Sequence, residues 1–301
     1  MKAELYIQAG NSLGEGPLWD FATNNLLWVD IEKKLLCISD VRKKNLIEVD
    51  FKSRLSAVAL TNKSNLVLLA LETGLELFDL KNGESVEIAN PERNIENNRF
   101  NDGKCDPVGR FWIGSMDRTV KPEAGSLYCL EGFNAPQRKL KHLTISNGMD
   151  WNLDKKQMYF IDTADYEVKC FDYKVETGSI CNPRKVITVP EGYGAPDGMC
   201  IDAEGMLWIA HWAGGNVSRW NPENGKLLET VIVPAPHVTS CCFGGENLDT
   251  LFITTARKGL NAQQLKDNPQ SGGIFFVQPG VKGLRTNLFQ IHLNKKLNGN
   301  Y

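Results

Sequence analysis

The 301-residue sequence lacks the features of several large protein classes. It carries 34 basic and 36 acidic residues, so its net charge is -2, and no basic run offers a surface for nucleic acid or anionic lipid. No stretch approaches the roughly 18 uninterrupted apolar residues of a membrane span. Residues 1–8 contain no apolar core of a signal peptide. We therefore expect a cytoplasmic protein without nucleic-acid or membrane partners.

Common catalytic and metal-binding motifs are also missing. The sequence has no G-x-S-x-G, H-E-x-x-H, Walker or dinucleotide-binding glycine motif. Its eight Cys form no C-x-x-C pair, and most of them lie in apolar runs, which favours reduced, buried thiols over disulfides or zinc. The four His are far apart, and His211, directly after an apolar strand pattern, is more typical of a structural or rim histidine than of a ligand.

A weak internal repeat of short apolar strands determines the predicted fold. Six strands with a bulky or aromatic centre recur at residues 28, 68, 112, 160, 208 and 252, a spacing typical of propeller blades. Without any long 3.6-residue period, helices should be few and short. We predict an all-β, six-bladed β-propeller with four strands per blade, forming one domain over residues 1–301 with a peripheral tail after about residue 285. Residues 4–8 should add a strand to the last blade and close the ring.

Polar residues recur at the start of the expected innermost strands, which line the channel of a propeller. Four blades place a carboxylate or amide before a glycine there, and the other two carry serine near the same position. Such dipeptides are also ordinary turn signals, but four at one phase of a repeat favour a ring of ligands at one mouth of the channel. The residues are Glu15, Asp102, Asn147 and Asp197, with Ser56 and Ser240 in the remaining blades.

The chemistry of this ring predicts a metal site. Glu15, Asn147 and Asp197 offer only oxygen atoms, which suit hard cations, and three protein ligands leave positions open for water and substrate. We expect one divalent metal ion, Ca²⁺ first, with Zn²⁺, Mg²⁺, Mn²⁺ and Fe²⁺ as alternatives. Asp197 or Asp102 could take a proton from water. Arg99 and Asn101 could bind sugar hydroxyls and a developing oxyanion, although an arginine in a loop can also be simply solvated.

Five motifs resemble those of the SMP-30/gluconolactonase/luciferin-regenerating enzyme family. They occur in order over nearly the whole chain, at residues 13–19 (LGEGPLW), 97–106 (NNRFNDGKCD), 145–151 (ISNGMDW), 196–199 (PDGM) and 240–245 (SCCFGG). The resemblance implies a six-bladed propeller that hydrolyses aldonolactones with a divalent metal in its channel, a regucalcin-like sugar lactonase. It also implies that Glu15, Asn147 and Asp197 are the metal ligands, that Asp197 is the base, and that Arg99 and Asn101 contact substrate.

One segment departs from the family pattern. Vertebrate members carry a substrate-contacting glutamate shortly after a Gly-Thr-Met stretch, whereas this sequence has Gly114, Ser115 and Met116 followed by Asp117. We expect Asp117 to bind substrate in place of that glutamate. Residues 117–125 should form a lid over the channel mouth.

The combined prediction is a metal-dependent hydrolase that opens a sugar lactone, such as glucono-, galactono- or xylonolactone, to the aldonic acid. In this interpretation Asp197 helps water to attack the lactone carbonyl. An organophosphate or aryl-ester hydrolase is an alternative, because a metal that polarises C=O can also polarise P=O. The second alternative is a non-catalytic, calcium-binding propeller. We expect a monomer or weak homo-oligomer whose partner is the small-molecule lactone.

Overall fold

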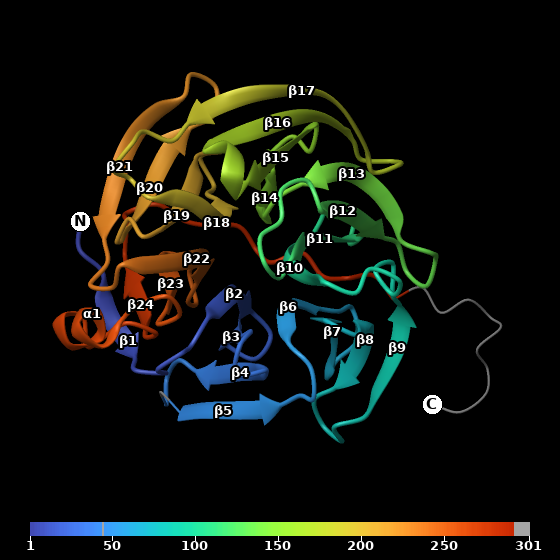
Figure 1. Ribbon diagram of the computed structural model, residues 1–301, viewed down its shortest axis with the longest axis horizontal. Helices are drawn as coiled ribbons and strands as arrows, with labels where there is room; N and C mark the ends of the chain where they lie inside the picture. Colours follow the sequence, from blue (N-terminus) through green and yellow to red (C-terminus); the bar gives the residue numbers. More distant parts are fainter. Residues whose placement is uncertain (44, 292–301) are drawn as a thin grey trace.

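Six antiparallel sheets form a closed ring in the computed structural model, which describes residues 1–43 and 45–291 (Figure 1). Each sheet has four strands, and the first strand of each sheet contacts the first strands of its neighbours around the central channel. The remaining strands lie progressively further outward (Figure 1). The prediction of an all-β, six-bladed propeller with four strands per blade is therefore confirmed.

The first three blades follow the chain in order, and every strand is antiparallel to the one before it. Blade 1 contains β2 (Gly14–Asp20), β3 (Asn25–Asp30), β4 (Leu35–Asp40) and β5 (Asn45–Asp50). Blade 2 contains β6 (Leu55–Leu60), β7 (Leu66–Leu71), β8 (Gly74–Asp79) and β9 (Ser85–Ala89). Blade 3 contains β10 (Asn98–Cys105), β11 (Phe111–Asp117), β12 (Gly125–Leu130) and β13 (Gln137–Leu143).

The last blade joins both ends of the chain. Blade 4 contains β14 (Ser146–Trp151), β15 (Gln157–Asp162), β16 (Glu167–Lys174) and β17 (Ser179–Thr188). Blade 5 contains β18 (Ala195–Ile201), β19 (Leu207–Trp212), β20 (Asn216–Asn221) and β21 (Lys226–Ile232). Blade 6 contains β22 (His237–Gly244), β23 (Thr250–Ala256), β24 (Ile274–Val277) and, as its outer strand, β1 (Glu4–Ile7). Because β1 pairs with β24, the ring closes as expected for residues 4–8.

Helical structure is scarce, as the sequence pattern predicts. The described residues contain one short α-helix, α1 (Ala262–Asp267), and one 3-10 turn, η1 (Thr163–Asp165). None of the helices among these residues has the length and apolar character needed to cross a membrane.

The second strand of each blade forms the centre of the packing between blades. Trp28, Trp112 and Trp208 at these positions are fully buried, and replacing such a residue by alanine typically costs about 3–5 kcal/mol. The turn before the strand holds the indole: Asp106 Oδ2 accepts from Trp112 Nε1 at 3.1 Å, and Asp202 Oδ2 from Trp208 Nε1 at 2.9 Å. In blades 3 and 5 the turn and the strand centre are therefore one hydrogen-bonded unit, whereas Trp28 Nε1 in blade 1 donates to Asn11 Oδ1.

The C-terminal segment, residues 282–291, crosses the far side of the ring (Figure 1) and is called the strap below. Gly283 N donates to Leu248 O, and Phe289 N donates to Leu60 O, so the strap joins blade 6 to blade 2. Phe289 is fully buried among apolar residues of blades 2 and 3. The expectation of a peripheral tail is thus wrong for residues 285–291, and the rest of that tail lies outside the described residues.

Candidate metal centre

A β-bulge interrupts the innermost strand of every blade near one mouth of the channel. The register shifts lie between Glu15 and Leu18, Leu55 and Ala57, Phe100 and Gly103, Ser146 and Met149, Pro196 and Met199, and Val238 and Ser240. A bulge leaves its extra residues outside the ladder and re-aims their side chains. The bulges therefore explain why polar residues can leave the regular alternation of the strand at this level.

The bulges also correct one predicted equivalence. In blades 4 and 5 the unpaired residues begin with Asn147 and Asp197, but in blade 3 they begin with Asn101. Asp102 is therefore one position out of phase with Asn147 and Asp197, because the bulge of β10 includes both Asn101 and Asp102. Glu15 is the last paired residue before the bulge of β2. A residue followed by glycine does not mark the same place in each blade.

The structure brings Glu15, Asn147 and Asp197 together at this mouth. A Cβ atom on Gly148 would lie 2.7 Å from the Asp197 carbonyl oxygen, so β14 and β18 approach each other at the bulges with no room for another side chain. Burial, and then the carboxylates of Asp197 and Asp102, raise the pKa of Glu15 well above its usual range. Burial and the Asp102 carboxylate do the same to the pKa of Asp197. The buried carboxyl groups of Glu15 and Asp197 are thus crowded by a third carboxyl group, that of the partly buried Asp102.

Two oxygen atoms of this group have no hydrogen-bond partner. Asn147 Oδ1 and Asp197 Oδ1 are buried without one, while Asn147 Nδ2 donates to Thr163 Oγ1 at 3.0 Å and so determines the orientation of the amide. Buried polar atoms without partners, like buried carboxylates that crowd each other, cost free energy. A divalent cation between them would satisfy both, and the oxygen-only donor set suits a hard cation. The residues therefore fit the predicted metal.

The amide is essential to this fit. Among residues 1–43 and 45–291, no three His, Cys, Asp or Glu side chains form a group able to hold a metal ion. Glu15 and Asp197 supply two carboxylates, and Asn147 completes the set with a neutral oxygen. Asp102 lies behind them, where Gly103 N donates to its Oδ1 at 2.7 Å and burial raises its pKa.

Arg99 and Asn101 form one hydrogen-bonded unit beside this group. Arg99 Nη1 donates to Phe100 O at 2.8 Å and to Asn101 Oδ1 at 2.7 Å, while Asn101 Nδ2 donates to Ser146 O at 2.8 Å. The Nε and Nη2 atoms of Arg99 have no acceptor in the described part of the chain. Burial lowers the pKa of Arg99, whereas the carboxylates of Glu32 and Glu15 oppose this change. Arg99 therefore offers donors to a ligand, and Asn101 positions it.

Asp117 ends β11 and organises the loop that follows. Its Oδ1 accepts from Thr119 N at 2.7 Å and from Thr119 Oγ1 at 2.5 Å, and these bonds lower the pKa of Asp117. The loop reaches both neighbouring blades, because Arg118 pairs with Glu72 at 2.9 Å and Glu123 N donates to Thr144 Oγ1. A lid formed by residues 117–125 and substrate binding by Asp117 both stay predictions.

Several supporting residues could not be identified from the sequence pattern. The buried Glu92 carboxylate accepts from Asn98 Nδ2 at 2.8 Å, Ser115 Oγ at 2.8 Å and Tyr128 Oη at 2.6 Å, which holds the strand that carries Arg99. Thr163, which orients Asn147, follows β15. These residues occur once each, in segments with no repeated pattern, so nothing in the blade repeat marks them.

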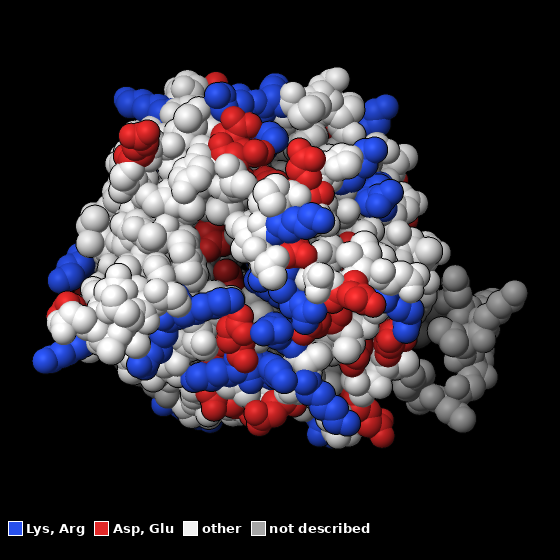
Figure 2. Space-filling model, viewed as in Figure 1, with Lys and Arg blue, Asp and Glu red and all other residues white. Residues whose placement is uncertain are grey.

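Ion pairs surround the same mouth. Arg54 contacts Glu32 at 3.1 Å and Glu72 at 3.5 Å, which links blades 1 and 2. Figure 2 shows basic and acidic side chains around a central hollow, with acidic side chains at its base. His211 lies apart from these charges: it is fully buried, its Nε2 is 2.5 Å from Ser218 Oγ, and burial lowers its pKa to about 4. It is a neutral structural residue.

Comparison with known proteins finds the same family over most of the chain. Residues 13–257 match the family model described as "SMP-30/Gluconolactonase/LRE-like region". Regucalcin of Sus scrofa is 40% identical over 290 residues, which cover 94% of this chain and 97% of that protein.

Solved structures agree with this match. A luciferin-regenerating enzyme superposes with a TM-score of 0.90 at 32% identity, covering 96% of this chain and 99% of that one. A calcium-binding protein, regucalcin, from Agrobacterium tumefaciens str. C58 superposes with a TM-score of 0.91 at 28% identity, covering 96% and 97%. The propeller and most of the chain are thus shared with these proteins.

Proposed function

Because the chain belongs to the SMP-30/gluconolactonase/LRE-like family, we propose that it is a metal-dependent hydrolase that opens a sugar lactone to the aldonic acid. One observation carries the proposal. Asn147 Oδ1 and Asp197 Oδ1 are buried without partners, next to an arginine with two free donor atoms. Oxygen ligands for a cation and donors for an oxyanion thus lie side by side, which is the arrangement that ester hydrolysis requires.

Glu15, Asn147 and Asp197 would hold the cation. Their oxygen atoms suit Ca²⁺, and the Agrobacterium tumefaciens regucalcin is described as a calcium-binding protein, which favours Ca²⁺ over Zn²⁺, Mg²⁺, Mn²⁺ or Fe²⁺. When bound, such an ion polarises a carbonyl group and lowers the pKa of water.

The side chains transfer the proton and stabilise the charge that develops on the substrate. The Asp197 carboxylate accepts the proton of the attacking water and returns it to the ring oxygen as the C–O bond of the lactone breaks. Arg99 Nε and Nη2 donate to the carbonyl oxygen as negative charge develops there, a contact typically worth about 2.7–4 kcal/mol per donor. Asn101 holds Arg99 in place. The product carboxylic acid then loses a proton at neutral pH, so acid release reports turnover.

The decisive experiment is a lactone panel on metal-stripped protein with Ca²⁺, Mg²⁺, Mn²⁺, Zn²⁺ and Fe²⁺ added back in turn. Gluconolactone, galactonolactone or xylonolactone should release acid faster than the uncatalysed background in a pH-stat. Asp197→Ala should abolish the metal-dependent rate. Asp154→Ala, in an exposed turn of blade 4, is the matched control and should keep it. An unchanged rate in folded Asp197→Ala would refute the mechanism.

The same panel distinguishes the alternatives. Turnover of phenyl acetate or paraoxon without turnover of any lactone would indicate an aryl-ester or organophosphate hydrolase. Tight metal binding without turnover would indicate a non-catalytic calcium-binding propeller. The two accessible nitrogen atoms of Arg99 beside the buried oxygens favour catalysis, because a binding site for calcium alone has no need of a cation there.

A further inference from the structure

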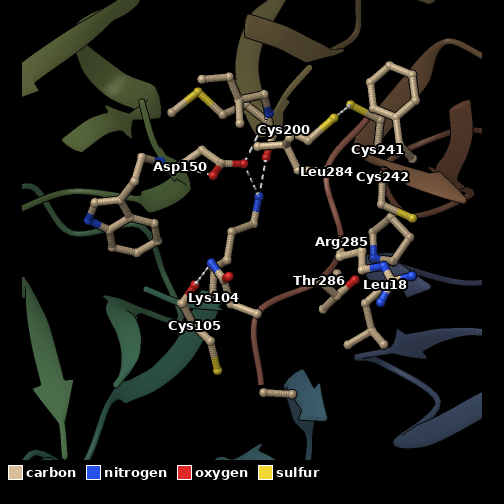
Figure 3. A pocket seen from close by; sticks show the side chains of 18 of the residues that line it. Leu18, Lys104, Cys105, Asp150, Cys200, Cys241, Cys242, Leu284, Arg285 and Thr286 are labelled. Carbon is tan, nitrogen blue, oxygen red and sulfur yellow. Dashed lines mark hydrogen bonds and ion pairs between the residues drawn. The ribbon is translucent and has the colours of Figure 1, made fainter. Parts of the chain in front are cut away.

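A cavity of about 320 Å³ lies further along the inner strands, and its lining begins at Gly16 and Asp102. Figure 3 shows it from close by. All six blades contribute to its wall, and residues 284–287 of the strap line it as well. Glu15, Asn147 and Asp197 are not among its lining residues. Its volume falls in the range of about 300–1,000 Å³ that small-molecule sites occupy. The channel therefore has a second compartment on the strap side of the ring.

A second ring of residues surrounds this compartment. In blades 3 to 6 the strand pairing resumes after the bulge at Gly103, Met149, Met199 and Ser240, and in each of these four blades the next residue lines the cavity. We call these next residues the second ring: Lys104, Asp150, Cys200 and Cys241. The second ring shares β14 and β18 with the metal centre and adds β10 and β22, and it contains one cation, one anion and two thiols.

Lys104 is the polar centre of the cavity. Its Nζ donates to Asp150 Oδ2 at 2.9 Å and to Met199 O at 2.8 Å, and Figure 3 shows the side chain extending across the compartment. Both oxygens of Asp150 accept hydrogen bonds within the protein, because Ile201 N and Trp151 N donate to them as well. An ammonium has three hydrogens, so one hydrogen of Lys104 has no acceptor in the described ranges.

The remaining hydrogen is accessible from the cavity. Although Lys104 comes from an innermost strand, 31% of its side-chain surface is accessible, against 15% for Asp150. The exposed cations Lys155 and Arg285 lie among the lining residues, so the lining holds three cations and, in Asp102 and Asp150, two carboxylates. The two carboxylates lie deep in the channel, and the exposed part of the lining is positive.

The rest of the wall is largely apolar. Leu18, Met199 and Phe243 line the cavity together with cysteine thiols. Such a wall suits a hydrocarbon body better than a sugar, whose hydroxyl groups would need many polar partners. One free charged donor suits one acceptor group, and a carboxylate matches it better than a phosphate dianion, which needs several donors.

We propose that this compartment is a second ligand site that binds a small organic monoanion. Its carboxylate accepts the free hydrogen of Lys104, and its apolar body lies against Leu18, Met199 and Phe243. Arg285 at the opening attracts the anion. The site is separate from the metal centre, and the inference does not depend on the proposed lactonase activity.

The test uses benzoate as probe and the neutral benzamide as its isostere, measured by isothermal titration calorimetry on the metal-loaded full chain. Benzoate should bind at least about tenfold more tightly than benzamide, since only the anion pairs with Lys104. The double variant Lys104→Met/Asp150→Leu, which removes both charges and leaves neither unpaired, should lose this preference. Arg285→Gln should weaken benzoate binding severalfold, mainly at low salt.

Two further variants separate the possible sites. Cys242→Phe puts a ring into the cavity from a half-buried position and leaves every charge in place, so it should abolish benzoate binding even if the double variant fails to fold. Asp197→Ala at the metal centre should leave benzoate binding unchanged. The proposal is overturned if benzoate fails to bind, if benzamide binds equally well, if Cys242→Phe binds normally, or if Asp197→Ala alone loses binding.

Discussion

The metal centre and the second ring occupy successive levels of the inner strands, with β14 and β18 common to both, and they differ in how their buried charges are paired. At the mouth, Glu15 and Asp197 lie buried with raised pKa values, which the charge of Arg99 lowers only in part, and neither forms an ion pair among the described residues. In the second ring, Lys104 supplies the cation for Asp150 from the neighbouring blade at 2.9 Å. A carboxylate whose counter-charge is built into the chain is a complete structural unit, whereas a group of carboxylates without one requires a cation from outside.

The pKa values express the same contrast. Burial lowers the pKa of Lys104, but the carboxylate of Asp150, together with Cys200 and Asp102, raises it overall, so the ion pair stays charged. At the mouth, burial and mutual repulsion act in the same direction on Glu15 and Asp197. Polar residues in one channel therefore differ in function according to whether their charges are balanced within the protein.

The largest expected effect concerns the metal. Glu15→Gln removes one of two carboxylate ligands and should weaken Ca²⁺ binding by at least about 100-fold, because even residues that only support a ligand contribute about 10–100-fold. Isothermal titration calorimetry on metal-stripped protein measures this change. Glu48→Gln, on the exposed outer strand of blade 1, is the matched control. Equal Ca²⁺ affinity in Glu15→Gln and Glu48→Gln would contradict the assignment of Glu15.

Substitution of Arg99 should have the next largest effect. It should lower the catalytic rate more than it lowers the affinity for the metal. Arg99→Gln keeps some hydrogen-bonding capacity but loses the charge and three of the five N–H donors, and it should lower kcat for the best lactone by about 100-fold. Ca²⁺ affinity should change by no more than about threefold, since Arg99 is not a ligand. Asn101→Ala, which frees Arg99 to move, should have a smaller effect on kcat. A loss of Ca²⁺ affinity equal to the loss of rate would place Arg99 in the metal site instead.

Substitutions in the second ring should lower the stability of the folded protein. Asp150→Asn leaves the Lys104 charge without its partner and should lower the free energy of unfolding by about 3 kcal/mol, as is typical when one member of a buried ion pair is removed. Ca²⁺ affinity should change little. Urea unfolding of wild type, Asp150→Asn and Lys104→Met/Asp150→Leu measures this, and the double variant should recover most of the loss. If Asp150→Asn is as stable as wild type, the ion pair between Lys104 and Asp150 does not stabilise the fold, and the contrast with the metal centre is wrong.

His211 is a third kind of buried polar group, one that stays neutral. Its pKa is about 4 in the folded protein, below the ordinary value of 6.5, so the unfolded chain binds the proton first as pH falls. Its contribution to stability is present above pH 6.5 and is lost as pH falls toward 4. Between pH 7 and pH 5 the loss should be about 2 kcal/mol. Urea unfolding of wild type and His211→Gln should show this slope only in the wild type, and parallel slopes would contradict it.

The sequence pattern was sufficient to predict the architecture. Each blade repeats a turn aspartate or asparagine, an apolar strand and a polar outer strand, and the packing between blades depends on these local units. The residues Glu15, Asn147 and Asp197 were identifiable because each stands next to a glycine at the start of an inner strand. Their chemistry as oxygen donors follows from residue type alone.

Other parts of the site depend on contacts between distant segments. The bulge in β10 moves Asp102 out of phase, and no local signal distinguishes it from the bulges that begin with Asn147 and Asp197. Glu92 reaches Asn98, Ser115 and Tyr128 from a loop. The strap is positioned by the burial of Phe289 between blades 2 and 3, although its sequence resembles an ordinary polar tail.

The sequence by itself determined the number of blades, the closing strand and the residue types available at the channel, because strand period and turn chemistry act over a few residues. Only the tertiary structure decided which of those groups have partners. The Oδ1 atoms of Asn147 and Asp197 stay free because no donor in the described part of the chain reaches them, whereas Asp150, on the same strand as Asn147, is paired with a lysine from another blade. Such pairing depends on the side-by-side packing of strands that are about 50 residues apart in sequence, a property of the closed ring.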